Sequence, residues 1–179
     1  VQATCNISDL NDLEYLFLAV PSQSIRSILN TDNFINNKAN IVLCSKGIEI
    51  STSKLLTEII SDTIKFNSLS VLSGPSFSDE VSQDLPTAVT LATKNRKDFL
   101  KLSLLINNKT FRMYYSDDLI GCQIGGSLKN IYAIASGIIH GLNLGENAKS
   151  ALISRSFVEM SRFADKLGSK KNTIYGLSG

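Results

Sequence analysis

The sequence has 179 residues, of which 43% are hydrophobic and 19% are charged, with no Trp and only three Pro. This is the composition of an ordinary globular protein, and it excludes collagen-like and disordered chains. The net charge of +2 comes from dispersed Lys and Arg residues, so the charge pattern excludes a nucleic-acid-binding face and an anionic membrane surface as partners.

The first two-thirds of the chain alternates between short apolar runs and amphipathic stretches. The apolar, aromatic and β-branched runs predict strands at Tyr15–Val20, Ile41–Ser45, Leu69–Ser73, Thr87–Thr93 and Phe111–Ser116. Helical spacing of apolar residues predicts helices at about Ser22–Leu29, Ser51–Ile60 and Asp98–Ile106. We expect Ser22 to be an N-cap, and Ser76 to open a short helix through a capping box with Asp79.

From Asp117 onward the pattern predicts helices alone. Asp117 or Asp118 can cap a long helix that runs to about Ile139, and a second helix is expected from about Asn147 to Leu167. Strands that alternate with helices indicate βαβ units and ligands at the carboxyl ends of the strands. The predicted fold class is therefore α/β: a partial Rossmann-like, mainly parallel sheet over residues 1–116, then the start of an all-α C-terminal domain over residues 117–179.

Two features suggest a piece of a longer protein. No GxGxxG motif occurs, so we expect the first βαβ unit of the nucleotide-binding domain to be absent. The chain also opens on Val1 and closes on Gly176-Leu177-Ser178-Gly179, a sequence typical of a loop. We therefore expect both termini of the parent protein to lie outside this chain, and the chain by itself to lack catalytic activity.

One predicted helix carries small residues and a lysine on a single face. Gly121, Gly125, Lys129, Ala133 and Gly137 follow one another at steps of four residues. Because each interior glycine costs about 1 kcal/mol relative to Ala, the stripe predicts close approach of another backbone or a ligand. From spacing alone, Lys129 is either a solvated helix lysine or a lysine in a partly dry site that transfers a proton.

Three strand ends carry further candidates. Lys46-Gly47 can bring a cation to a phosphate, and Gly74-Pro75-Ser76-Phe77 offers a rigid turn and free helix N–H groups. An ordinary surface turn explains the first equally well, and an ordinary helix start explains the second. Pro21-Ser22 marks a third strand-to-helix corner, which is common in α/β proteins.

The remaining reactive side chains do not suggest a site. His140, the single histidine, stands at a predicted helix C-terminus, where we interpret it as structural or solvent-facing. The cysteines are odd in number and far apart, so we interpret Cys5, Cys44 and Cys122 as small core hydrophobes in a reducing cytoplasm. No Cys/His cluster predicts a metal site.

Five segments together resemble one enzyme family along nearly the whole chain. They are AVPS at 19–22, SKGIE at 45–49, LSGPSF at 72–77, LPTAVTLAT at 85–93, and IGCQIGGSLKNIYAIASGIIHGLNLGENAKSALISRSFVEMSRFADKLG at 120–168. This ordered set is similar to the bacterial-type NAD(P)-dependent glycerol-3-phosphate dehydrogenases. The resemblance implies reversible reduction of dihydroxyacetone phosphate to sn-glycerol 3-phosphate, with NAD or NADP as cofactor, feeding glycerophospholipid synthesis.

The resemblance also implies roles for single residues. Lys129 matches the family's proton donor and acceptor, and Asn130 its neighbour in the substrate site. Lys46 matches a position near both substrate and cofactor. Gly74 and Ser76 match substrate contacts, and Ser78 a cofactor contact, although alanine is usual in the family at the position of Ser78. His140 likewise stands where the family often has an acidic residue.

Two alternatives remain open at this stage. The parent protein could be a related two-domain dehydrogenase acting on a hydroxy acid, and the chain itself could be a non-catalytic structural or interaction module. The expected partners are the small-molecule substrate and product, with no nucleic acid. Apolar runs around Leu16–Val20 and Ile131–Ile139 are too short for stable membrane insertion, and the helical region offers a reasonable place for a homodimer contact.

Overall fold

The computed structural model describes residues 3–10, 13–31 and 38–176, so Val1 and the last three residues of the predicted C-terminal loop lie outside it. Its strands are β1 (Tyr15–Leu18), β2 (Asn40–Leu43), β3 (Ser68–Ser73), β4 (Thr87–Thr93) and β5 (Phe111–Ser116). Its helices are η1 (Ile7–Leu10), η2 (Ser22–Ser24), α1 (Ile25–Leu29), α2 (Leu56–Thr63), α3 (Ser78–Ser82), α4 (Arg96–Ile106), α5 (Leu119–Gly141) and α6 (Gly145–Lys166).

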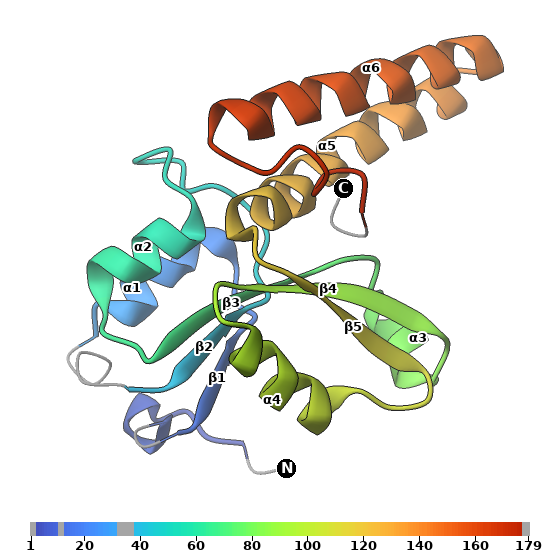
Figure 1. Cartoon of the computed structure of the whole chain (residues 1–179). Helices are drawn as coiled ribbons and strands as arrows, with labels where there is room; N and C mark the ends of the chain where they lie inside the picture. The colour runs from blue at the N-terminus through green and yellow to red at the C-terminus, as the bar shows by residue number, and fades with distance from the viewer. Residues whose placement is uncertain (1–2, 11–12, 32–37, 177–179) are drawn as a thin grey trace.

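The five strands form one sheet in the order β1-β2-β3-β4-β5 (Figure 1). Strands β1, β2 and β3 are mutually parallel, as are β4 and β5, while β3 and β4 pair antiparallel. The connection between β3 and β4, residues 74–86, contains only the five-residue helix α3 and returns the chain antiparallel to β3. The chain therefore turns back after β3, which the predicted alternation of strands and helices did not indicate.

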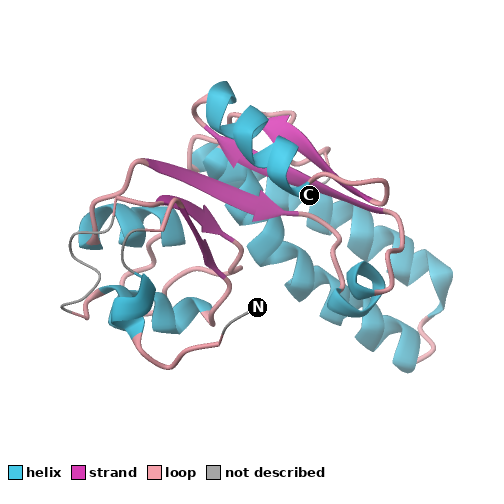
Figure 2. Ribbon diagram, turned by 90° about the horizontal axis from the view of Figure 1, so that it is seen from below, coloured by secondary structure: helices cyan, strands magenta, loops and turns pink. Residues whose placement is uncertain are grey.

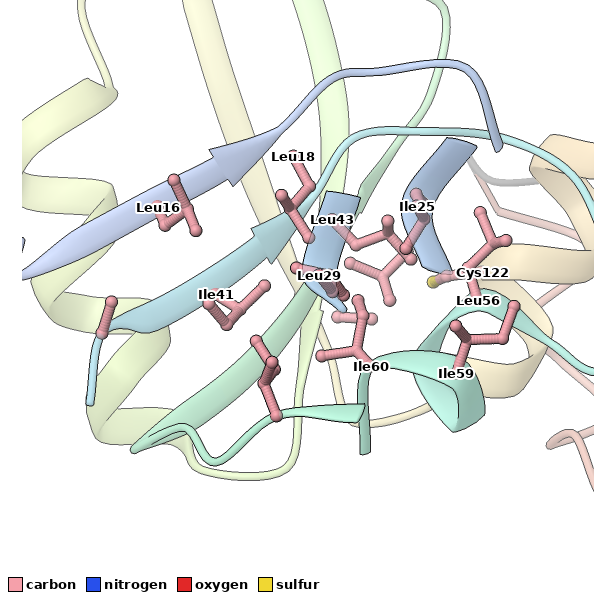
Figure 3. Close-up of a cluster of buried hydrophobic side chains, with 14 residues drawn as sticks. Leu16, Leu18, Ile25, Leu29, Ile41, Leu43, Leu56, Ile59, Ile60 and Cys122 are labelled. Carbon is pink, nitrogen blue, oxygen red and sulfur yellow. The ribbon is translucent and has the colours of Figure 1, made fainter. Parts of the chain in front are cut away.

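Both faces of the sheet are covered by helices (Figures 1 and 2). Side chains alternate between two hydrophobic clusters: Ile41 and Leu43 point toward α1 and α2, whereas Val42 lies between them and points toward α4. Figure 3 shows the first cluster, in which Cys122 of α5 joins the strand and helix side chains. Burial on both faces explains why the strands read as nearly continuous apolar runs.

Helices α5 and α6 lie side by side and extend away from the sheet (Figure 1). A third cluster joins them, with Ile124 of α5 against Met160 and Ala164 of α6. Asp118 caps α5 by accepting a hydrogen bond from the backbone N–H of Gly121 at 2.9 Å, as predicted. The observed fold confirms an α/β protein with a mainly parallel sheet that continues into helices.

Several local predictions were wrong. Ser22 is not an N-cap, because it is the first residue of the 3₁₀ turn η2, where no side chain makes a cap hydrogen bond. Helix α2 begins at Leu56 rather than Ser51, because Ser53 takes a positive φ of 57° and donates its N–H to the carbonyl of Glu49. Ser76 opens no capping box, because Phe77 is the N-cap of α3.

The helix and cysteine predictions also need correction. Helix α4 begins two residues earlier than predicted, at Arg96, where the side chain of Asn95 accepts a hydrogen bond from the backbone N–H of Lys97. Cys122 is fully buried and Cys44 partly buried, as expected for small core residues, but Cys5 is exposed. Cys5 is therefore not a core residue.

Candidate functional site

The candidate residues gather where the parallel strands β1, β2 and β3 end at a common edge of the sheet. Lys46 follows β2, Gly74 follows β3, and Lys129 lies in the middle of α5, whose first half packs against the end of β3. Parallel strands that end together bring residues far apart in the sequence to one place. The sheet topology thus unites three of the positions that the sequence singled out.

The segment carrying Lys46 is fixed on both sides by close contacts at Gly47. Its φ is +144°, and a Cβ atom on this residue would lie only 2.6 Å from Ser22 Oγ. Its backbone N–H donates to Ser127 Oγ of α5 at 3.0 Å. Glycine is therefore required here, and the loop after β2 is tied both to the end of β1 and to α5.

The turn after β3 packs just as closely. Gly74 has a φ of +148°, and a Cβ atom there would lie 2.9 Å from the Cα atom of Val89 in β4. Its carbonyl accepts a hydrogen bond from Lys46 Nζ at 3.4 Å. The predicted strand ends at Lys46 and Gly74 are therefore in direct contact.

Lys129 is half-buried, and its electrostatic surroundings differ from those of a solvated helix lysine. Desolvation by burial, and then the nearby positive charge of Lys46, lower the pKa of Lys129 below its ordinary value. Lys46 itself is exposed, as is Asn130 next to Lys129. Two ammonium groups that repel each other at one edge form a site that favours an anionic ligand.

Ser76 and Ser78 are both exposed and lie beyond the turn, Ser76 just before α3 and Ser78 at its first residue. The structure thus brings Lys46, Gly74 and Lys129 together and leaves the two serines on the accessible segment that follows.

The glycines of the stripe on α5 do not all have the same surroundings. A Cβ at Gly121 would lie 2.4 Å from both Asp118 Oδ2 and Ser169 Oγ, so this glycine makes room for a hydrogen-bond cluster. At Gly137, in contrast, a Cβ would meet nothing within 4 Å. Close approach is required at Gly121 but not at Gly137, so the prediction was wrong for the outer end of the helix.

Two family models match the chain, each covering one of its parts. The model described as NAD-dependent glycerol-3-phosphate dehydrogenase N-terminus matches residues 1–99, and the C-terminus model of the same enzyme matches residues 118–179. The chain belongs to the NAD-dependent glycerol-3-phosphate dehydrogenase family.

Similar proteins carry the same name. The chain is 46% identical over 180 residues to the glycerol-3-phosphate dehydrogenase [NAD(P)+] of Novosphingobium aromaticivorans and 43% identical over 179 residues to that of Erythrobacter litoralis. All of this chain is matched in both cases, but only 54% of each relative. The chain therefore spans about half the length of these curated relatives. Their bacterial origin confirms the predicted bacterial type of the glycerol-3-phosphate dehydrogenase family.

Solved structures of the family have the same fold. The crystal structure of glycerol-3-phosphate dehydrogenase from Coxiella burnetii matches 99% of this chain and 55% of its own, with a TM-score of 0.92 and 37% identity. A glycerol-3-phosphate dehydrogenase structure from Plasmodium falciparum matches 97% of this chain and 50% of its own, with a TM-score of 0.89 and 26% identity. These similarities confirm the predicted Rossmann-like arrangement.

Sequence reasoning missed two residues that shape the site of this glycerol-3-phosphate dehydrogenase family member. Ser127 accepts the hydrogen bond from Gly47, and Ser73 lies buried against Gly126. The one sign of Ser127 in the sequence was its position, which puts a hydroxyl between Gly126 and Lys129 on the predicted helix. For Ser73, the sequence does not show which strand face meets α5.

Other sites are not evident in the described ranges 3–10, 13–31 and 38–176. No helix there is long and apolar enough to cross a membrane. No group of three or more His, Cys, Asp or Glu side chains there could hold a metal ion. His140 is exposed in the last turn of α5, which agrees with a solvent-facing residue.

Proposed function

We propose that this protein acts in an NAD(P)-dependent dehydrogenase that interconverts dihydroxyacetone phosphate and sn-glycerol 3-phosphate. The observation that carries this proposal is the half-buried Lys129 beside Lys46, at the edge where β2 and β3 end. The names of the relatives and the two family models support it. A phosphate ester is an anion, and two neighbouring lysines favour its binding.

Lys129 is the proposed proton carrier. In the reducing direction its ammonium Nζ gives a proton to the carbonyl oxygen of the substrate, and in the oxidising direction the amine takes a proton from the hydroxyl. The lowered pKa of Lys129 supports this role, because it brings the two protonation states closer in energy near neutral pH. Asn130, on the next residue of α5, is proposed to hold the substrate through its amide.

Lys46, Gly74 and Ser76 are proposed to complete the substrate site. The exposed ammonium of Lys46 attracts the phosphate ester, while its hydrogen bond to the carbonyl of Gly74 keeps its side chain at the end of β3. The hydroxyl of Ser76 lies on the accessible segment beyond this turn. The positive φ of Gly74 gives the chain the tight turn that this arrangement needs.

A nicotinamide cofactor, NAD or NADP, would supply or remove the hydride when bound. The residues present fit its nicotinamide end: Lys46 and Ser78 are exposed on segments that follow the parallel strands β2 and β3, the edge where such sheets bind ligands. We propose that both residues contact the cofactor. The ribose-binding residue that selects NAD or NADP is not evident among them.

We also propose a division of the chain into a cofactor-binding part, residues 1–116, and the beginning of a helical substrate part, residues 117–179. The bounds of the two family models, 1–99 and 118–179, support this division. A cytoplasmic location, a homodimer and the absence of a nucleic-acid partner belong to the same proposal. Cys5, Cys44 and Cys122 form no disulfide among the described residues, which is compatible with a reducing compartment.

A chimera tests the function. Residues 1–179 replace the matching segment of the Novosphingobium relative, and oxidation of NADH and NADPH is followed with dihydroxyacetone phosphate. We expect turnover, and we expect Lys129→Ala to lower kcat by about 100-fold or more with little change in cofactor affinity. Lys149→Ala, at a half-buried lysine of α6 that lies 3.8 Å from Glu146, is the matched control.

Two results would contradict the proposal. A folded chimera that oxidises neither cofactor rejects the dehydrogenase function. A Lys129→Ala chimera whose kcat stays within threefold of the parent, like the expected Lys149→Ala variant, rejects proton transfer by Lys129.

A further inference from the structure

Ser73, the last residue of β3, carries a hydroxyl that has no visible purpose in the fold. The residue is 4% exposed, and its Oγ is buried with no hydrogen-bond partner among the described residues. A buried hydroxyl without a partner is unfavourable and rare in native proteins. Ser70 of the same strand has a similar orphan hydroxyl, but it is three residues away and so points to the opposite face of the sheet.

The surroundings of Ser73 connect it with the candidate site. A Cβ atom on Gly126 of α5 would lie 2.8 Å from Ser73 Oγ and 3.5 Å from Lys46 Cγ. Helix α5 therefore approaches the end of β3 closely, and it does so at a residue without a side chain. Ser73 and the stem of Lys46 meet over the backbone of Gly126.

Lys129 rises from the same helix face, three residues after Gly126. Side chains on an α-helix lean toward its N-terminus, so the Lys129 stem covers the turn that contains Gly126. Its charge also interacts with that of Lys46, whose stem passes the same glycine. The flexible four-carbon side chain of Lys129 therefore leaves the helix beside the end of β3, the strand end that carries the orphan hydroxyl.

We propose that Ser73 is a positioning residue for Lys129. Its hydroxyl accepts a hydrogen bond from the Lys129 ammonium, and it donates a hydrogen bond to the amine after the proton has left. A lysine that transfers protons needs a neighbour that can do both, and a hydroxyl can rotate to do so. The carbonyl of Gly74 can only accept and already binds Lys46, and the Lys46 ammonium can only donate. The inference rests on the proposed proton transfer by Lys129.

The test measures Lys129 in the 179-residue chain without substrate or cofactor. Trace acetylation by acetic anhydride is followed from pH 7 to pH 11.5 for the parent, Ser73→Ala and the control Ser70→Ala. Cleavage before Asp118 and after Glu146 releases a peptide in which Lys129 is the single lysine. We expect Ser73→Ala to move the midpoint of Lys129 reactivity down by about 0.5 to 1 pH unit, because a hydrogen bond from a charged donor is stronger than one between neutral groups.

Thermal unfolding separates positioning from a structural role. Ser73→Ala removes at most the one proposed hydrogen bond to Lys129, so its Tm should stay within about 4 °C of the parent. Ser70→Ala should keep both the parent Tm and the parent midpoint for Lys129. An unchanged or raised Lys129 midpoint in Ser73→Ala overturns the proposal. If that variant does not fold, Ser73→Cys keeps the shape with a weak S–H group, and an unchanged midpoint there overturns it equally.

The two proposals fail separately. A lowered midpoint together with an inactive chimera supports the positioning contact and rejects the dehydrogenase function. An active chimera together with an unchanged midpoint supports the function and rejects the contact.

Discussion

Asp118 joins the first turn of α5 to the segment that follows α6, and Asp118→Asn tests how much this link stabilises the fold. Its Oδ1 accepts a hydrogen bond from the N–H of Gly121 at 2.9 Å. Its Oδ2 accepts three more, from Ser169 Oγ at 2.8 Å, the N–H of Lys170 at 2.8 Å and Thr173 Oγ1 at 2.5 Å. Desolvation raises the pKa of Asp118, but these hydrogen bonds outweigh it, so its pKa lies below the ordinary value.

An asparagine at position 118 has one carbonyl oxygen and one NH₂ group, so it cannot accept all four bonds. Either orientation turns the NH₂ group toward one backbone N–H, that of Gly121 or that of Lys170. Because the carbonyl oxygen keeps three hydrogen bonds in the place of Oδ2 and only one in the place of Oδ1, the NH₂ group should face Gly121. The asparagine then loses the helix cap, at a cost of about 1 kcal/mol, and its other bonds become neutral, at a cost of about 1 kcal/mol more. We expect the free energy of unfolding to fall by about 2 kcal/mol and Tm by about 4–8 °C.

Urea and thermal unfolding followed by circular dichroism at pH 7 measure this loss. Asp117→Asn is the matched control, because that exposed carboxylate pairs only with the exposed ammonium of Lys170, at 2.5 Å, and should leave Tm nearly unchanged. A lowered folded-state pKa means that Asp118 stabilises the fold above its unfolded pKa of about 3.9, and that this stabilisation is lost as pH falls through the folded-state pKa. The difference between parent and Asp118→Asn should therefore shrink in acid. Equal Tm values for the two variants, or a difference that stays constant through the acid range, would refute the reasoning.

Three further predictions follow from single contacts. Gly126→Ala should lower the free energy of unfolding by about 1–3 kcal/mol in urea, whereas Gly137→Ala, which has open space, should raise it by up to about 1 kcal/mol; equal effects would contradict the close approach at Gly126. Glu49 accepts two hydrogen bonds from Arg26 at 2.8 Å, which lower the pKa of Glu49 to about 2. Glu49→Gln should therefore reduce Tm at pH 7, and the reduction should become smaller as pH falls toward 2. An unchanged Tm at pH 7 counts against this. Burial raises the pKa of Cys44 to about 11, so its reaction with iodoacetamide at pH 8 should be slow until the chain is unfolded, and rapid alkylation of the folded chain would disprove its burial.

The sequence predicted best the strands whose bounds depend only on their own side chains and on the residues next to them. Strands Thr87–Thr93 and Phe111–Ser116 have the predicted bounds. Pro86 and Lys94 flank the β-branched run, and Thr110 and Asp117 flank the aromatic run. The start of α2 was wrong because the turn at Ser53 depends on a hydrogen bond to Glu49, which the local pattern does not reveal. The antiparallel return of β4 is a matter of pairing between β3 and β4, which the sequence of neither strand reveals.

The site was predictable to a similar degree. Spacing marked Lys129 as unusual, but its half-burial beside Lys46 depends on how α5 crosses the sheet, and only the family resemblance assigned it a role. The contact of Lys46 with Gly74 joins residues 28 positions apart, which requires the order of β2 and β3 in the sheet. The contact of Ser73 with the site was harder still to predict, because it depends on which residue of α5 packs against the end of β3.

Burial along α5 changes sharply near its middle. All residues from Gly121 to Gly126 are buried, whereas Ile131, Ile134 and Ile138 are 57%, 66% and 56% exposed. Backbone amides of the inner turns can exchange with solvent only through a large opening, while those of the outer turns need only local fraying. Lys129 lies at this transition, and because its stem leans back over the turn that contains Gly126, the lysine is held by the protected half of the helix.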